Sequence, residues 1–189
     1  KRYNSDSDFK SITDGYESVV KRYKEGIIFL ENNENARKAF QLMHITFDRY
    51  SKDKGYNGWR IFQIVFIVSL IPDIINLNHN RRNEVDLLHV NTGGGKSEAY
   101  FGLVVFSAFY DRLIGKRFGP TAITKFPLRM LSVDQLQRIA NLFIFAEEVR
   151  IEFINNKEDH PFSVAYFVGT SDEYPRKTIT IIKEVKQNK

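Results

Sequence analysis

The 189-residue chain contains no cysteine, one tryptophan, two methionines and five prolines. Without cysteine it forms no disulfide, has no thiol nucleophile and binds no zinc or iron–sulfur cluster through thiolates. This absence suits a reducing compartment, so we expect a cytoplasmic protein. Long hydrophobic runs are also missing, because the longest one, residues 61–75, is interrupted by Gln63, Ser69, Pro72 and Asp73. It is too short and too broken to span a bilayer, so we expect no membrane partner.

The composition that is present favours a folded domain. Hydrophobic residues make up 42% of the chain and aromatic residues 14%, which is too many core formers for a disordered segment. Lys and Arg number 28 against 23 Asp and Glu, a net charge of +5 that includes the pair Arg81-Arg82. Such a modest excess suits either a track for nucleic-acid phosphates or simple solubility.

Two helical segments are predicted before residue 75. Apolar residues recur at three- and four-residue steps through 33–50, and Asn33 is placed to cap the first turn. Residues 59–70 are apolar nearly all round, which is typical of a buried helix that we expect Pro72 to end. The first 25 residues are polar and mixed in charge, and predict little order at the very start.

From residue 85 onward, short apolar runs alternate with longer amphipathic stretches. Three of the short runs predict strands, at 85–90, 121–126 and 163–168. Helices are expected between them, the first closed by Gly115 and the second opened by a capping box at Ser132. This order is typical of a parallel sheet covered by helices. The sequence therefore predicts an α/β domain at residues 58–189, preceded by a helical extension at residues 1–57.

The strongest chemical signal is a glycine-rich turn between the first predicted strand and its helix. It reads Thr92-Gly93-Gly94-Gly95-Lys96-Ser97. Such a turn lets several backbone N–H groups converge on phosphate oxygens, because no Cβ obstructs their approach. Lys96 would reach the β- and γ-phosphates and the Ser97 hydroxyl would coordinate Mg²⁺. Since Val90 stands where the usual pattern has its first glycine, a plain turn with a solvated lysine is the alternative.

Residues 92–100, which read Thr-Gly-Gly-Gly-Lys-Ser-Glu-Ala-Tyr, resemble motif I of superfamily 2 helicases. They are especially similar to the DrmA-like large helicase of DISARM-type phage-defence systems. Residues 128–135 resemble motif Ia, and residues 59–63, Trp-Arg-Ile-Phe-Gln, resemble the glutamine motif that reads adenine. Gly169-Thr170 is similar to motif Ib. The resemblance extends over about residues 26–170.

This resemblance implies a RecA-like P-loop NTPase and an ATP-dependent DNA helicase or translocase of phage defence. ATP and Mg²⁺ would be its cofactors, and DNA and other subunits of a defence complex its partners. Gln63 would read adenine, whereas Arg129 and Thr170 would contact the nucleic-acid backbone. Each has a plainer alternative: a hydrogen-bonded core glutamine, a solvated loop arginine and an ordinary loop threonine.

A P-loop NTPase also needs a carboxylate that holds Mg²⁺ and orients water. The nearby pair Asp172-Glu173 is separated from the third predicted strand by three residues, and we interpret it as a solvated loop pair. No segment is left for a second motor domain, so we expect the first part of a motor, which binds nucleotide but hydrolyses it poorly. The alternatives are a non-hydrolysing nucleotide-binding or DNA-clamp module and, less favoured, a small-molecule phosphotransferase. The latter needs several arginines after the third strand, where only Arg176 lies.

Overall fold

The computed structural model describes residues 6–52, 58–91, 93–126, 129–154 and 160–167. Within these residues every regular element is a helix and none is a strand. The elements are α1 (Asp6–Asn32), α2 (Glu34–Lys52), α3 (Ile61–Ile75), the short 3₁₀ helix η1 (Asn80–Asn83), α4 (Lys96–Leu113) and α5 (Arg129–Phe153).

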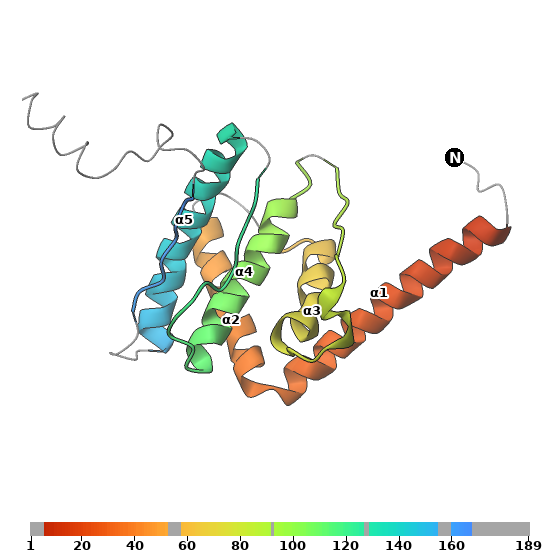
Figure 1. The fold of residues 1–189 in the computed structure, drawn as a ribbon, viewed down its shortest axis with the longest axis horizontal. Helices are drawn as coiled ribbons and strands as arrows, with labels where there is room; N and C mark the ends of the chain where they lie inside the picture. The colour runs from red at the N-terminus through yellow and green to blue at the C-terminus, as the bar shows by residue number, and fades with distance from the viewer. Residues whose placement is uncertain (1–5, 53–57, 92, 127–128, 155–159, 168–189) are drawn as a thin grey trace, which may run out of the picture.

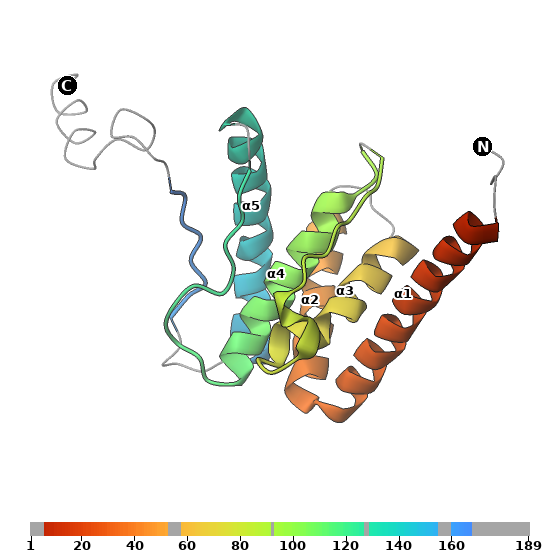
Figure 2. The ribbon, with the colours of Figure 1, turned by 45° about the vertical axis from the view of Figure 1, so that its right-hand side comes forward.

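Helix α4 lies at the centre of the arrangement. It packs against α2, α3 and α5, while α1 packs mainly along α3 and more briefly against α2. In Figure 1 the helices α5, α4, α3 and α1 follow one another across the molecule, with α2 behind α4. The first half of α1 projects away from the other helices in both views (Figures 1 and 2). The body of the fold is therefore a helical bundle with one long arm.

The core lies where α2, α3, α4 and α5 meet. Its largest fully buried apolar side chains are Phe106, Phe109, Met43, Ile67, Ile71 and Leu142. Burying each such side chain contributes about 1.5–3 kcal/mol, so this cluster supplies much of the driving force for folding. Ala36 and Ala39, both fully buried, let α2 approach its neighbours closely. None of the described helices is long and apolar enough to cross a membrane.

The prediction of an α/β, RecA-like parallel sheet is wrong. The runs at 85–90 and 121–126 pair with no strand among the described residues, and Val85, Leu87 and Ile123 are 95%, 90% and 87% exposed. A strand is stable only when a neighbouring strand accepts and donates its backbone hydrogen bonds, and a short apolar run does not encode that neighbour. In this structure α2, α3 and α5 pack against α4 in place of a sheet. The predicted domain boundary at residue 57 lies outside the described residues.

The third predicted strand, 163–168, is not formed among its described residues 163–167, and the residue before it, Phe162, is held by aromatic contacts. Phe162 inserts edge-on between Phe109 and Phe143, with ring centroids 5.5 and 5.6 Å away. Its backbone N–H donates to Glu147 Oε2 at 3.2 Å. Burial opposes ionisation of Glu147, but hydrogen bonds from Arg150 and from the Phe162 N–H hold the pKa of this carboxyl below its usual range.

Several helix signals are confirmed. Helix α2 covers the predicted 33–50, and Asn33 Oδ1 accepts a hydrogen bond from the Ala36 N–H at 2.9 Å, which caps the first turn. Gly115 follows the end of α4 with a φ of +80°, a conformation that glycine adopts without strain.

Three other helix predictions are wrong. Helix α1 begins at Asp6, within the part of the chain expected to have little order; residues 1–5 lie outside the described residues, and α1 packs on α3 through the half that does not project from the bundle. Pro72 lies inside α3 instead of ending it. Helix α5 begins at Arg129, so Ser132 is within the helix and does not cap it.

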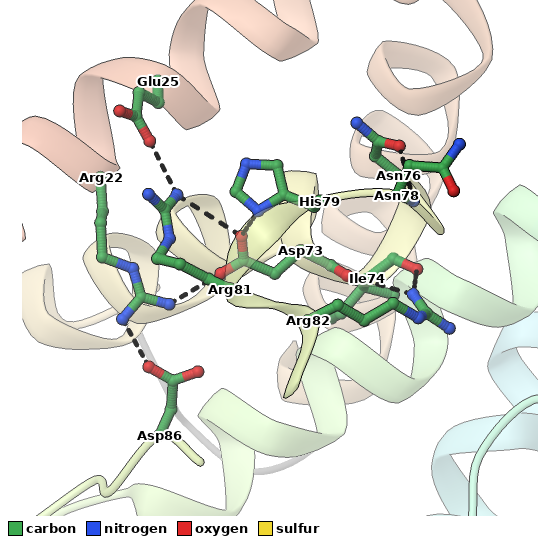
Figure 3. A network of polar contacts seen from close by, with 10 residues as sticks. All are labelled: Arg22, Glu25, Asp73, Ile74, Asn76, Asn78, His79, Arg81, Arg82 and Asp86. Atoms are coloured by element: carbon green, nitrogen blue, oxygen red, sulfur yellow. Dashed lines mark hydrogen bonds and ion pairs between the residues drawn. The ribbon is translucent and has the colours of Figure 1, made fainter. Parts of the chain in front are cut away.

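A buried carboxylate joins α1, α3, η1 and the segment that leads to the glycine turn. The side chain of Asp73 is 8% exposed; its Oδ2 pairs with Arg22 at 2.8 Å and its Oδ1 with His79 Nδ1 at 2.6 Å (Figure 3). Arg81 lies 3.4 Å from the same Oδ1. Arg22 also pairs with Asp86 at 2.5 Å. A buried charge is tolerated only with such partners, so this network fixes the four segments relative to one another.

The same network occupies the two arginines that the sequence offered as basic surface charge. Arg81 pairs with Glu25 of α1 at 2.7 Å, and this hydrogen bond lowers the pKa of the Glu25 carboxyl. Arg82 donates to the backbone carbonyls of Asp73 and Ile74 at 3.1 and 2.9 Å (Figure 3). Both side chains therefore stabilise the end of α3.

Substitution of Gly26 tests the close contact between α1 and α3. A Cβ built on Gly26 would lie 2.0 Å from the Val68 carbonyl oxygen, whereas one on Gly15 in the same helix meets nothing within 4 Å. Gly26→Ala should lower the free energy of unfolding by about 1–3 kcal/mol, because a backbone atom is in the way. Gly15→Ala should raise it by up to about 1 kcal/mol, because alanine is the better helix former. Urea denaturation measures both, and equal shifts would contradict the close contact.

Candidate functional site

The glycine turn adopts a backbone that only glycine accommodates easily. Gly93 and Gly95 have φ values of +76° and +84°, and Gly95 is the residue that precedes α4. The Gly94 N–H donates to the Asn91 carbonyl at 2.9 Å, and a Cβ on Gly94 would stand 2.5 Å from Val90 Cγ1. The three glycines thus make a tight turn that exposes backbone next to the first turn of α4. Thr92 lies outside the described residues.

Lys96 and Ser97 form the first turn of α4. Lys96 Nζ donates to the carbonyls of Val90 at 2.5 Å and Asn91 at 3.2 Å, so its ammonium lies across the turn. Both Lys96 and Ser97 are half-buried and line the same cavity. An ammonium held only by neutral carbonyls gains more from an anion, so Lys96 is placed to exchange these contacts for phosphate oxygens.

The N-terminus of α3 holds the glycine turn in place. Gln63 is buried; its Nε2 donates to the Gly95 carbonyl and its Oε1 accepts from the Arg60 N–H, both at 2.7 Å. Arg60 Nη1 donates to the Gly94 carbonyl at 2.9 Å. Two carbonyls of the turn are therefore bonded to two side chains of one element.

This arrangement gives Gln63 a positioning role that the sequence alone did not indicate. Its amide donor and acceptor are both engaged with backbone groups, and its side chain also lines the cavity. Adenine recognition by Gln63 stays a prediction. Binding adenine through the amide would require a change in at least one of these contacts or the use of its second N–H.

The glycine turn opens into a cavity of about 1280 Å³. Its walls come from α2, the start of α3, the start of α4, part of α5 and the residues Leu88 and Phe126. Ligand cavities in proteins commonly measure about 300–1,000 Å³, so this one has ample room for a nucleotide. Four helices that are distant in sequence thus meet around the predicted phosphate-binding turn.

One part of the cavity wall is aromatic. Its members are His44, Phe47, Tyr50, Trp59, Tyr100 and Phe126. Trp59 is the only tryptophan in the chain and packs on Phe47 with ring centroids 4.4 Å apart. Aromatic faces suit a planar base, so the cavity combines a phosphate-type turn with a base-type surface.

The other part of the wall carries charge. Lys96, Arg60 and Arg138 supply cations, and Asp48 and Glu98 supply carboxylates. Arg138 Nη2 pairs with Glu98 Oε1 at 2.5 Å and joins α5 to α4. Neither Glu98 nor Arg138 was among the predicted site residues. Glu98 lies within the stretch 92–100 that resembles motif I, and Arg138 lies three residues after the stretch that resembles motif Ia.

Gln135 of α5 forms hydrogen bonds next to this ion pair. The Tyr100 hydroxyl donates to Gln135 Oε1 at 2.8 Å, and Arg138 Nη1 reaches the same oxygen at 3.4 Å. Gln135 Nε2 donates to Asp134 Oδ2 at 2.9 Å. Gln135 is buried, so it anchors α5 on α4 close to the cavity.

The structure does not describe the side chains of the two predicted nucleic-acid residues. Arg129 is the first residue of α5 and follows no strand, so the reason for placing it at the end of a sheet no longer holds. Its side chain, Thr170, and the pair Asp172-Glu173 all lie outside what the structure describes. DNA contact by Arg129 and Thr170 stays a prediction.

Ser97, the predicted Mg²⁺ ligand, lines the cavity. Among the described residues no group of three or more His, Cys, Asp or Glu side chains is placed to hold a metal ion. Mg²⁺ is usually bound through one or two protein groups together with substrate phosphates and water. The Ser97 hydroxyl fits that use, and its role stays a prediction.

Comparison with known proteins gives one relationship. The chain is 28% identical to the DISARM protein DrmA of Bacillus paralicheniformis over 208 aligned positions, which cover 90% of the chain and 18% of that protein. This supports a DrmA-like relationship, and the chain spans less than a fifth of the relative's length. No protein-family model and no solved structure matches the chain.

His44 predicts a pH dependence of stability. Burial lowers the pKa of its imidazole, which lies between Phe40 and Trp59 at centroid distances of 4.4 and 5.7 Å. As the pH falls below about 6.5, the unfolded state binds this proton first, so His44 should cost stability with a slope of at most about 1.4 kcal/mol per pH unit. His44→Phe keeps a ring there and should remove that part of the slope. Denaturation between pH 8 and 5 measures it.

The exposed His160 is the control for this experiment. His160→Phe should leave the slope as it is in the unmodified chain. If both variants have the same pH dependence, protonation of His44 is not what destabilises the fold in acid.

Proposed function

We propose that the cavity binds ATP with Mg²⁺, and that the chain is the nucleotide-binding part of an ATP-dependent DNA helicase or translocase of phage defence. The observation that supports the nucleotide most directly is the glycine turn itself. It leads into Lys96 and Ser97 at the edge of a cavity with cationic and aromatic walls. The similarity to the DISARM protein DrmA supports the defence role.

In this proposal the residues of the turn bind the phosphates and Mg²⁺ together. The backbone N–H groups of Gly93 to Lys96 would surround phosphate oxygens, with that of Gly94 giving up the Asn91 carbonyl. Lys96 would exchange the Val90 and Asn91 carbonyls for the β- and γ-phosphates. The Ser97 hydroxyl would hold Mg²⁺, and the metal would supply positive charge next to the phosphates. Gln63 holds the turn from α3, so the groups that bind the phosphates are preorganised.

A non-hydrolysing nucleotide-binding module is the second candidate, and the cavity itself favours it. Asp48 and Glu98 are the carboxylates that line the described part of the wall. Asp48 pairs with Lys52 at 3.0 Å and Glu98 with Arg138 at 2.5 Å, so both carboxylates are ion-paired in this structure. This pairing favours nucleotide binding without turnover for as long as both ion pairs persist.

Lys96→Ala tests the phosphate site. Because it removes the cation that lies across the turn, affinity for ATP·Mg²⁺ should fall about tenfold or more. Trp59, the only tryptophan, lines the cavity and reports binding by a change in its fluorescence. Lys116→Ala is the control. Lys116 follows the C-terminal end of α4, at the opposite end of the helix from Lys96, and pairs with Asp111 of its last turn. Unchanged affinity of Lys96→Ala by calorimetry would rule out the phosphate assignment.

The rate of ATP hydrolysis by the full-length protein of which this chain would be the nucleotide-binding part, measured with and without DNA, separates the two candidates. A motor should hydrolyse ATP faster when DNA is present, and its DNA affinity should fall steeply as salt rises. ATP that binds in a Lys96-dependent way but is not hydrolysed under either condition would favour the non-hydrolysing module instead.

A further inference from the structure

We infer that Arg138 is a second phosphate-binding cation of the cavity and that Glu98 is the internal anion that holds it until a nucleotide enters. The inference rests on the proposed nucleotide site and adds to it a residue from α5. It concerns how the site changes on binding, whereas the proposed function concerns only what it binds.

The pair lies at the phosphate end of the cavity. Glu98 Oε2 lies 3.5 Å from the position that a Cβ on Gly95 would take, so this carboxylate is against the glycine turn. Its other oxygen, Oε1, pairs with Arg138 Nη2 at 2.5 Å. Both side chains line the same cavity as Lys96. A phosphate bound by the turn would therefore arrive next to Glu98 and within the neighbourhood of Arg138.

Charge decides which partner Arg138 prefers once a phosphate is present. The Arg138 and Glu98 side chains are 29% and 24% exposed, so their charges are only partly screened by water. A triphosphate carries more charge than one carboxylate and offers several oxygens to the planar guanidinium. The same phosphate repels Glu98. The expected result is an exchange in which Glu98 turns away and Arg138 pairs with phosphate.

The exchange would couple phosphate binding to the contacts between α4 and α5. Arg138 and Gln135 belong to α5, while Glu98 and Tyr100 belong to α4. Gln135 stays bonded to the Tyr100 hydroxyl at 2.8 Å, so α5 remains attached when Arg138 moves. The Arg138 guanidinium also lies 5.6 Å from the ring centroid of Phe101 on α4, a cation–π contact beside the ion pair.

Two variants of the pair distinguish an exchange from a fixed link between α4 and α5. Glu98→Gln and Arg138→Gln each break the ion pair, so both should lower the melting temperature. Their effects on affinity for ATP·Mg²⁺ should be opposite. Arg138→Gln should weaken binding about tenfold, because it removes a charge-assisted contact. Glu98→Gln should tighten it about threefold to tenfold, because it removes the competing anion.

A matched control is an ion pair that joins α2 to α5. Arg49 is also 29% exposed and pairs with Glu152 of α5 at 2.6 Å, away from the cavity. Arg49→Gln should lower the melting temperature without changing affinity for ATP·Mg²⁺. Inorganic tripolyphosphate should show the same opposite shifts with the two variants of the pair, since the exchange involves only phosphate.

The outcomes separate this inference from the proposed function. If ATP binds through Lys96 and both variants weaken it, or Glu98→Gln leaves it unchanged, the pair is a fixed link and the inference is wrong while the nucleotide site stands. If neither ATP nor tripolyphosphate binds the unmodified chain, the proposed function fails and the inference fails with it. Opposite shifts in affinity alongside a shared loss of thermal stability support the exchange.

Discussion

The buried amide of Gln63 is the contact on which the geometry of the candidate site depends. It donates to the Gly95 carbonyl and accepts from the Arg60 N–H, so one side chain both completes the first turn of α3 and holds the glycine turn. Losing this amide would leave two partly buried backbone groups without this partner, which costs stability. The turn is rich in glycine, which favours many backbone conformations, yet hydrogen bonds from the N-terminus of α3 hold it in one position.

Helix α4 carries that position into the hydrophobic core. Its first turns present Lys96, Ser97 and Glu98 to the cavity, and further along Val105 and Phe106 are fully buried among α2, α3 and α5. Groups on a well-packed helix keep their geometry better than groups on a loop. The same helix therefore joins the buried core to the candidate site, and at the cavity it meets α5 through the side-chain contacts of Glu98 with Arg138 and of Tyr100 with Gln135.

The sequence predicted local features well and their assembly poorly. The cap at Asn33 and the glycine turn before Lys96 depend on neighbours within a few residues, and the structure contains both. The sheet was wrong, because pairing between distant strands is not encoded in runs such as 85–90. The ion pair between Glu98 and Arg138 was missed for a similar reason: it joins residues 40 positions apart and depends on how α4 and α5 pack.

Pro72 and Gly26 are linked in a way that neither position shows by itself. A proline has no N–H, so within α3 the carbonyl four residues earlier, that of Val68, lacks its usual intrahelical donor. That carbonyl is the group against which Gly26 of α1 packs, with no room for a Cβ. The missing hydrogen bond and the missing side chain therefore meet at one atom. Substitutions at these two positions should be judged together, because each one sets what the other helix can tolerate.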